Sequence, residues 1–85
     1  MTLEQLKDKY EMTNYSEFAD DYIYGVLDDC EDKDDDYIVD NKIKSAIRNL
    51  NKDLKESIQR SNWKGMETYI AKLEKAIAEL KELLK

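Results

Sequence analysis

The chain of 85 residues contains no histidine and no proline, only two glycines and a single cysteine. Histidine is the commonest general base and metal ligand, so its absence removes the usual catalytic triads and most zinc sites. The two separate glycines, Gly25 and Gly65, cannot form a glycine-rich phosphate-binding loop. The one cysteine excludes an internal disulfide. We therefore expect a protein that is not an enzyme and needs no cofactor.

Long apolar runs are also missing. No stretch approaches the roughly 18 apolar residues that a membrane-spanning helix needs. The opening residues MTLEQLKDKY have no apolar segment of the kind that a secretory signal requires. Lysine greatly outnumbers arginine, and Asn, Asp, Ile and Tyr are frequent, which suggests an AT-rich bacterial or phage genome. We expect no contact with a membrane and a location in the cytoplasm of a bacterial host.

The residues that are present favour helices in the N-terminal part. Thr2 with Gln5 has the spacing of a capping box and predicts a short first helix, with Leu3, Leu6 and Tyr10 on one face. Asn14 with Glu17 repeats this pattern and predicts the start of a second helix. That helix should run to about Cys30 with apolar side chains at helical spacing, namely Phe18, Ala19, Tyr22, Ile23, Val26, Leu27 and Cys30. Gly25 lies inside this helix and suggests a close helix approach.

The C-terminal half predicts a helical hairpin over residues 40–85. The third helix should be capped by Asp35 or Asp36, or should start at Asp40 after an extended segment, and should bury Ile43, Ile47, Leu50, Leu54 and Ile58. Ser61–Asn62 should form a turn of two to four residues, with Asn62 capping the last helix. This helix carries an a/d seam formed by Met66, Ile70, Leu73, Ile77, Leu80 and Leu84.

These patterns predict one domain over residues 1–85, an all-α bundle of three or four helices built on the C-terminal antiparallel hairpin. No useful alternation of apolar and polar residues indicates a sheet. The second helix should pack across the hairpin, and the first should close one end. The a/d seam could instead hold a homodimer together through the C-terminal helix.

Charge divides the chain into two unequal parts. Residues 1–40 hold 14 acids and 3 bases, a net charge of −11, whereas residues 41–85 hold 6 acids and 11 bases, a net charge of +5. The densest acidic run consists of Asp28, Asp29, Glu31, Asp32, Asp34, Asp35, Asp36 and Asp40. Like charges this close repel one another in a compact chain, so we read about residues 31–36 as a connection between helices. The run is either a solvated loop or an interaction surface.

The charged residues fit neither a calcium-binding loop nor a nucleic-acid-binding surface well. An EF-hand loop beginning at Asp32 would need glycine at its sixth position and glutamate at its twelfth, where the chain has Tyr37 and Ile43. Only weak divalent-cation binding by the acidic run remains. The basic residues of the third helix do not all share a face, and the net charge of −6 opposes direct contact with nucleic acid. They are Lys42, Lys44, Arg48, Lys52, Lys55 and Arg60.

Several tyrosines accompany the acidic residues. Tyr22 and Tyr24 lie about 200° apart on a helix, so they cannot both face the core. Exposed tyrosines either cover the edge of a core or anchor an interface, and we select Tyr24 and Tyr37 as interface candidates. Trp63 should pack over the end of the hairpin. Cys30, surrounded by acids, is expected to be a small buried apolar side chain rather than a nucleophile.

The expected function is stoichiometric binding without chemistry. Carboxylates held on a helical frame can imitate the phosphates of a nucleic acid and occupy the basic site of a nucleic-acid-binding protein. In size and charge the chain resembles the acidic inhibitors that phages use against host defence, including anti-CRISPR and anti-restriction proteins. The alternative is a helical interaction or oligomerisation module, in which the acidic run only keeps the protein soluble.

Overall fold

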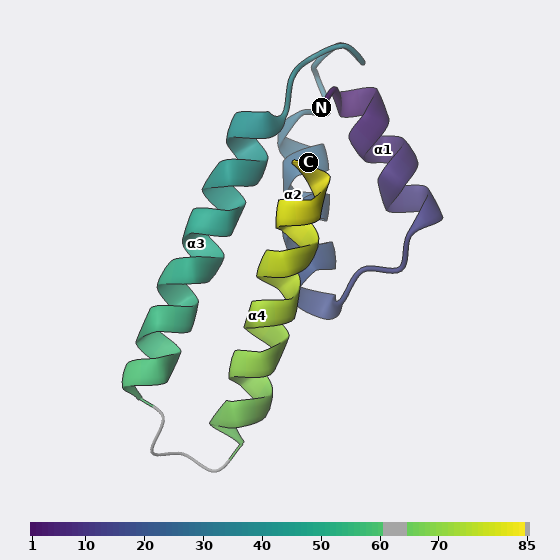
Figure 1. Ribbon diagram of the computed structural model, residues 1–85. Helices are drawn as coiled ribbons and strands as arrows, with labels where there is room; N and C mark the ends of the chain where they lie inside the picture. The colour runs from purple at the N-terminus through teal and green to yellow at the C-terminus, as the bar shows by residue number, and fades with distance from the viewer. Residues whose placement is uncertain (61–64, 85) are drawn as a thin grey trace.

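A computed structural model describes residues 1–60 and 65–84 of the chain. Within them lie four α-helices, α1 (Leu3–Met12), α2 (Glu17–Asp29), α3 (Asp40–Gln59) and α4 (Met66–Leu83). Figure 1 shows α3 and α4 side by side and antiparallel, α2 behind them, and α1 at the end where α3 begins and α4 stops. An isolated bridge between Thr2 and Ile38 is the extent of strand-like pairing in these residues. The all-α bundle built on a hairpin is confirmed.

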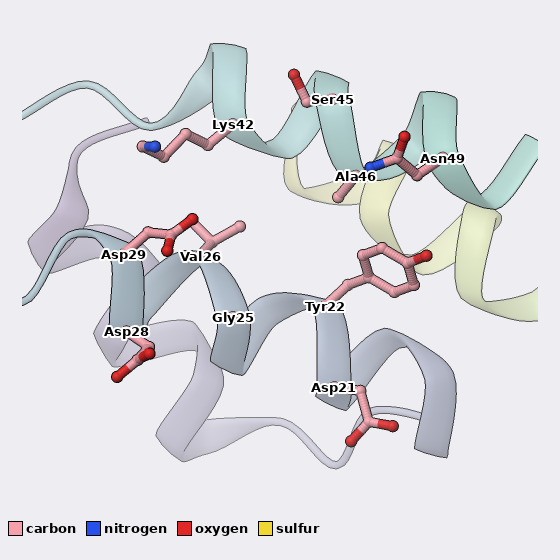
Figure 2. Close-up of a pocket in the computed structure, with 10 residues that line it drawn as sticks. All are labelled: Asp21, Tyr22, Gly25, Val26, Asp28, Asp29, Lys42, Ser45, Ala46 and Asn49. Atoms are coloured by element: carbon pink, nitrogen blue, oxygen red, sulfur yellow. The ribbon is translucent and has the colours of Figure 1, made fainter.

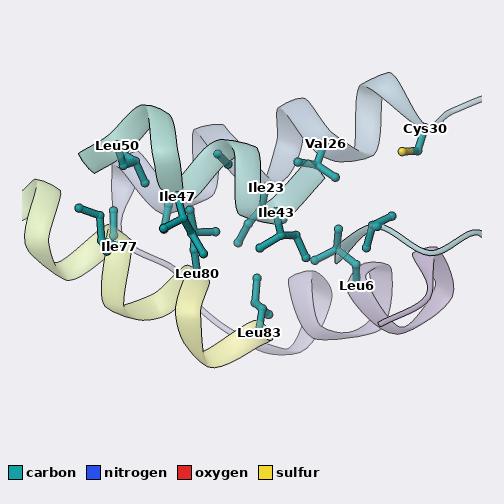
Figure 3. Packing of buried hydrophobic residues seen from close by; sticks show 14 of the residues in the cluster. Leu6, Ile23, Val26, Cys30, Ile43, Ile47, Leu50, Ile77, Leu80 and Leu83 are labelled. Atoms are coloured by element: carbon teal, nitrogen blue, oxygen red, sulfur yellow. The ribbon is translucent and has the colours of Figure 1, made fainter. Parts of the chain in front are cut away.

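A single hydrophobic core joins the four helices (Figure 3). The helices α3 and α4 share the largest contact, and α2 packs mainly on α4 and less on α3. The largest fully buried side chains come from every helix and include Leu3, Leu6, Ile23, Ile43, Leu50, Leu73 and Leu80. Half of the predicted seam of α4, namely Leu73, Ile77 and Leu80, is therefore buried inside its own chain, and the other three seam residues are half-buried.

The hairpin extends beyond the helix that covers it. The helix α3 has 20 residues and α2 has 13, which correspond to lengths of about 30 Å and 20 Å at 1.5 Å per residue. The molecule is accordingly elongated, with extents of 45 × 22 × 22 Å. Towards the far end of α3, Ile58 is 52% exposed and Ser57 is buried instead. The prediction of Ile58 as a core residue was wrong because Ser57 takes the inward-facing position there, and Ile58 lies on the outer side of α3 beside Arg48 and Lys55.

Only some of the helices start in the way that the sequence predicted. The capping box of α1 is confirmed, since Thr2 Oγ1 accepts from the backbone of Gln5 and the Gln5 side chain accepts from the backbone of Thr2. The capping box at Asn14 was wrong, because α2 begins at Glu17 with Ser16 in the N-cap position. The Ser16 hydroxyl makes no cap; it binds a side chain of α4 instead.

The start of α3 corresponds to the alternative that placed it at Asp40. Val39 occupies the N-cap position and is fully buried. Asp35 and Asp36 do not cap this helix, because they lie in a turn several residues earlier. Ile38 pairs with Thr2 in an extended conformation, as the alternative required. Burial of Val39 and pairing of Ile38 thus fix the start of α3 more strongly than a side-chain cap.

Three further expectations concern the hairpin turn and the cysteine. Gly65 has a positive φ of 95° and occupies the N-cap position of α4, and the expected turn at Ser61–Asn62 lies outside the described residues. Asn62 and Trp63 lie outside the described residues. Cys30 is fully buried at the end of α2, as expected for a small apolar side chain.

Candidate functional site

The acidic connection between α2 and α3 is tied to the N-terminal segment by backbone hydrogen bonds. The N–H groups of Leu3 and Glu4 donate to the carbonyls of Tyr37 and Asp35, at 2.8 and 2.9 Å. In return, the N–H of Val39 donates to the carbonyl of Met1 at 3.1 Å. The first N–H groups of a helix have no partner within it, so the carbonyls of the connection complete the start of α1. The connection is consequently held in a defined shape.

Within the connection, two successive hydrogen-bonded turns leave the side chains exposed to solvent. The N–H of Lys33 donates to the carbonyl of Cys30, and the N–H of Tyr37 donates to that of Asp34. Residues 31–38 are all exposed. The exposed carboxylates of the predicted site are those of Asp28, Asp29, Glu31, Asp32, Asp34, Asp35 and Asp36. The acidic run is therefore exposed along the end of α2 and through the connection, and we call this exposed segment, residues 28–36, the acidic ridge.

Two of the predicted acids have partners in the structure. The carboxylate of Asp40 lies 2.6 Å from the amino group of Met1 and is partly buried. The carboxylate of Asp35 lies 3.4 Å from Nζ of Lys7, and both side chains are exposed. The pair at Asp40 joins the N-terminal segment to the start of α3, so Asp40 has a structural contact that the sequence did not reveal. An exposed pair such as the one at Asp35 adds little stability.

Two acids lie where a helix disfavours them. Asp28 and Asp29 form the last residues of α2, and no basic residue occurs in its last turn. The C-terminus of a helix carries a partial negative charge, so each carboxylate there costs about 0.3–1 kcal/mol. Asp28 and Asp29 therefore lower the stability of α2.

The two tyrosines that the sequence selected are exposed. Tyr24 is 62% exposed on α2, and Tyr37 is 36% exposed in the connection. Nζ of Lys33 lies 5.7 Å from the centre of the Tyr37 ring, in the range of a cation–π contact. Tyr22 is half-buried, which confirms that Tyr22 and Tyr24 face different ways. Both exposed rings lie on the elements that carry the acidic ridge.

A groove between α2 and α3 adjoins the ridge (Figure 2). Its volume is about 490 Å³, and Asp21, Tyr22, Gly25, Val26, Asp28 and Asp29 line it from α2, with Lys42, Ser45, Ala46 and Asn49 from α3. The sequence prediction included Asp28 and Asp29 but missed the groove. The spacing of Asp21, Gly25 and Asp28 on one helical stripe was a signal that could have indicated its α2 wall.

The surroundings of two tyrosines raise the pKa values of their hydroxyl groups. The pKa of Tyr10 is raised, first because its side chain hydrogen-bonds to Asp20 and also by burial and nearby carboxylates. The pKa of Tyr22 is raised by burial and by the charge of Asp53. Both hydroxyls therefore stay protonated at neutral pH and act as hydrogen-bonding groups. Neither shift provides a catalytic base.

Basic side chains collect on a separate surface. Arg48, Lys52 and Lys55 line a shallow hollow on the outer side of α3, with Leu54 and Ile58 as its apolar part. Lys42 belongs instead to the groove beside α2. The basic residues of α3 are therefore divided between two faces. In the residues that the structure describes, no three acidic or cysteine side chains come together in a way that could hold a metal ion.

Of the described helices, none is both long enough and apolar enough to cross a lipid bilayer. Comparisons of the chain with protein-family models, with curated proteins and with solved structures give no match.

Proposed function

We propose that the protein is a small, non-enzymatic inhibitor that occupies the basic nucleic-acid site of a target protein as an acidic mimic of nucleic acid. This mode of action resembles that of phage proteins directed against bacterial defence systems. The observation that carries the proposal is the acidic ridge, whose connection is held to α1 by backbone hydrogen bonds. A ridge of fixed shape presents its charges at defined spacings, as a phosphate backbone does.

The favourable free energy of such a complex comes from complementary potentials and faster association. Tyr24 and Tyr37 supply apolar area on the same elements, and tyrosine is enriched among residues that dominate binding energies. The acids at the end of α2 support the proposal indirectly, because they oppose the helix dipole. Residues that lower stability without a structural return are often retained for function.

The alternative is an interaction module that uses the a/d seam of α4. Leu73, Ile77 and Leu80 of this seam are buried against the rest of the chain. A second copy or a partner helix could reach them only if the bundle opened. The acidic ridge needs no such opening, so we favour it as the binding surface.

The test is a charge-removal variant. Asp32, Asp34, Asp35 and Asp36 are replaced together by asparagine, after the wild-type protein has been used to capture and identify its partner from the host. The four side chains are exposed and make no core contact, so the variant should fold. We expect a basic, nucleic-acid-binding partner whose affinity for the variant falls by at least tenfold, mainly through slower association. Nucleic acid should compete with the wild-type protein for this partner.

A matched control removes the same number of charges elsewhere. Asp8 and Glu11 of α1 with Glu67 and Glu74 of α4 are exposed, and their replacement by asparagine or glutamine changes the net charge equally. This control should bind much more tightly than the variant of the connection. The mimic proposal is wrong if the variant of the connection binds the partner as tightly as the control variant does. It is also wrong if the affinity of the wild-type complex does not fall as the salt concentration rises. In either case the interaction module takes its place.

A further inference from the structure

The shallow hollow on the outer side of α3 combines apolar side chains with basic ones. Its volume is about 520 Å³, and its lining consists of Arg48, Asn51, Lys52, Leu54, Lys55 and Ile58. At 3.6 residues per turn, these positions centre about 150° around the helix from the residues of α3 that line the groove beside α2. The hollow therefore lies on a side of α3 that α2 does not cover. There Ile58 is 52% exposed and Leu54 is half-buried.

The three cations of the hollow have no acidic partner in their own fold. Arg48, Lys52 and Lys55 are exposed, and none of them makes an ion pair with a carboxylate of residues 1–60 or 65–84. They follow one another at spacings of four and three residues, so they are neighbours on the helix surface and repel one another. An apolar floor bordered by such cations is complementary to an exposed apolar side chain that has carboxylates beside it.

The connection between α2 and α3 carries a surface of that kind. Ile38 is 57% exposed and Tyr37 is 36% exposed. They directly follow the three aspartates of residues 34–36, which are also exposed. The bridge between Ile38 and Thr2 holds this part of the backbone in place. The connection thus presents apolar groups and negative charges together, and the hollow presents apolar groups and positive charges together.

The two surfaces cannot meet within one chain. The connection enters α3 at Asp40, at the end of the helix where α1 lies (Figure 1). Leu54 comes 14 residues after Asp40 in the same helix, which places it about 21 Å further along the axis. Because α3 itself holds the two surfaces apart, they can make contact only between two copies of the chain.

We propose that the hollow of one copy binds the connection of a second copy. The apolar contact joins Ile38 to Leu54 and Ile58, and the carboxylates of residues 34–36 lie against the cations of the hollow. This inference goes beyond the proposed function, because it assigns a ligand to the outer side of α3. The contact joins different surfaces of the two copies, so copies add head to tail into chains or rings.

The contact has consequences for concentration and for the target. Both surfaces are small, as in transient protein complexes, so the association requires a high protein concentration. Opposite charges bring the copies together, so the association weakens as salt screens them. The carboxylates of residues 34–36 belong to the acidic ridge. A copy bound in this way therefore cannot present these carboxylates to a target protein at the same time.

The first experiment measures the average mass of the full chain by sedimentation equilibrium as the protein concentration is raised. We expect the mass to rise above that of one chain at low salt, and to rise less at high salt. The hollow variant, Arg48→Glu with Lys55→Glu, should raise the dissociation constant at least about tenfold relative to a control variant. The control, Lys72→Glu with Lys75→Glu, changes the net charge equally at exposed positions of α4. A single chain at every concentration, or equal association of the two variants, would overturn the inference.

The second experiment mixes two variants that each keep one of the two surfaces. The charge-removal variant of the connection keeps its hollow, and the hollow variant keeps its connection. Each should remain a single chain, whereas an equimolar mixture should form a 1:1 dimer, because one intact hollow then binds one intact connection. Circular dichroism first verifies that both variants keep the helix content of the wild type, as expected for substitutions at exposed positions. A mixture that stays monomeric where the wild type associates contradicts the head-to-tail contact.

The hollow variant also separates this inference from the proposed function. It keeps every carboxylate of the acidic ridge, so it should bind the captured target at least as tightly as the wild type does. If it associates with itself as the control does, the inference about the hollow is wrong and the mimic proposal stands. If it loses self-association and the target is insensitive to the charge-removal variant, the mimic proposal is wrong and the head-to-tail contact stands.

Discussion

Ser16 and Glu79, which are 63 residues apart in sequence, are joined by two hydrogen bonds to a single carboxylate oxygen. The backbone N–H of Ser16 donates to Oε2 of Glu79 at 3.0 Å, and the Ser16 hydroxyl donates to the same atom at 3.1 Å. The carboxylate of Glu79 therefore satisfies a backbone donor at the start of α2 and joins that start to α4. This pair sets where α2 lies along the hairpin and, with it, where the acidic ridge and the groove are formed.

Removal of the Glu79 carboxylate should destabilise the bundle. Glu79→Ala leaves a partly buried N–H without its acceptor, which costs about 1–3 kcal/mol. Ser16→Ala loses only the hydroxyl bond and should cost about 1 kcal/mol. Urea denaturation followed by circular dichroism measures both. Glu74→Ala, at an exposed position of the same helix, is the control. Equal stabilities for Glu79→Ala and Glu74→Ala would contradict a role for the pair.

The middle of α4 and the last turn of α3 should respond differently to truncation. Leu73 is 2% exposed, and Leu73→Ala should lower the free energy of unfolding by about 2–4 kcal/mol through lost burial and a cavity. Ile58 is more than half exposed, and Ile58→Ala should change it by less than about 0.5 kcal/mol. Thermal melting of the two variants provides the comparison. A large loss for Ile58→Ala would mean that this end of α3 is covered in solution.

Neutralising the end of α2 should stabilise the protein. The double substitution Asp28→Asn with Asp29→Asn removes two carboxylates from a helix C-terminus and should add about 0.3–1 kcal/mol for each. The gain should shrink at high salt, because exposed charges are screened. Melting temperatures at low and high ionic strength measure the effect. A variant that melts below wild type would show that these acids make stabilising contacts.

Stability should decline at alkaline pH. The raised pKa values of Tyr10 and Tyr22 mean that the folded protein holds these protons more tightly than the unfolded chain does. The stabilisation is complete below the unfolded tyrosine pKa of about 10 and is lost as pH rises through the folded values. Urea midpoints measured from neutral pH to beyond pH ~10 should therefore fall at the alkaline end. Tyr22→Phe should make this fall shallower, and an unchanged alkaline slope in that variant would exclude Tyr22 as its source.

Local signals determined most of the helices. The Thr2–Gln5 capping box and the apolar spacing of α2 and α4 act over one or two helical turns, so they can be read along the chain. The same is true of the acidic run, because like charges that are adjacent in sequence stay adjacent and exposed after folding. The hairpin with α2 across it follows from the sequence because each helix has one apolar face to bury.

Tertiary contacts decided the rest. The Ser16 hydroxyl makes no cap bond to α2 because it donates to Glu79, and Asp40 pairs with the amino group of Met1 because the N-terminal segment folds back on the connection. The groove at Gly25 exists only once α3 lies beside α2, and Ile58 is exposed because the packing of α3 turns Ser57 inward and leaves Ile58 outside. Each of these features depends on atoms that are distant in sequence. Composition and spacing therefore determined the elements and the charge of this protein, and helix packing alone determined the shape of its candidate site.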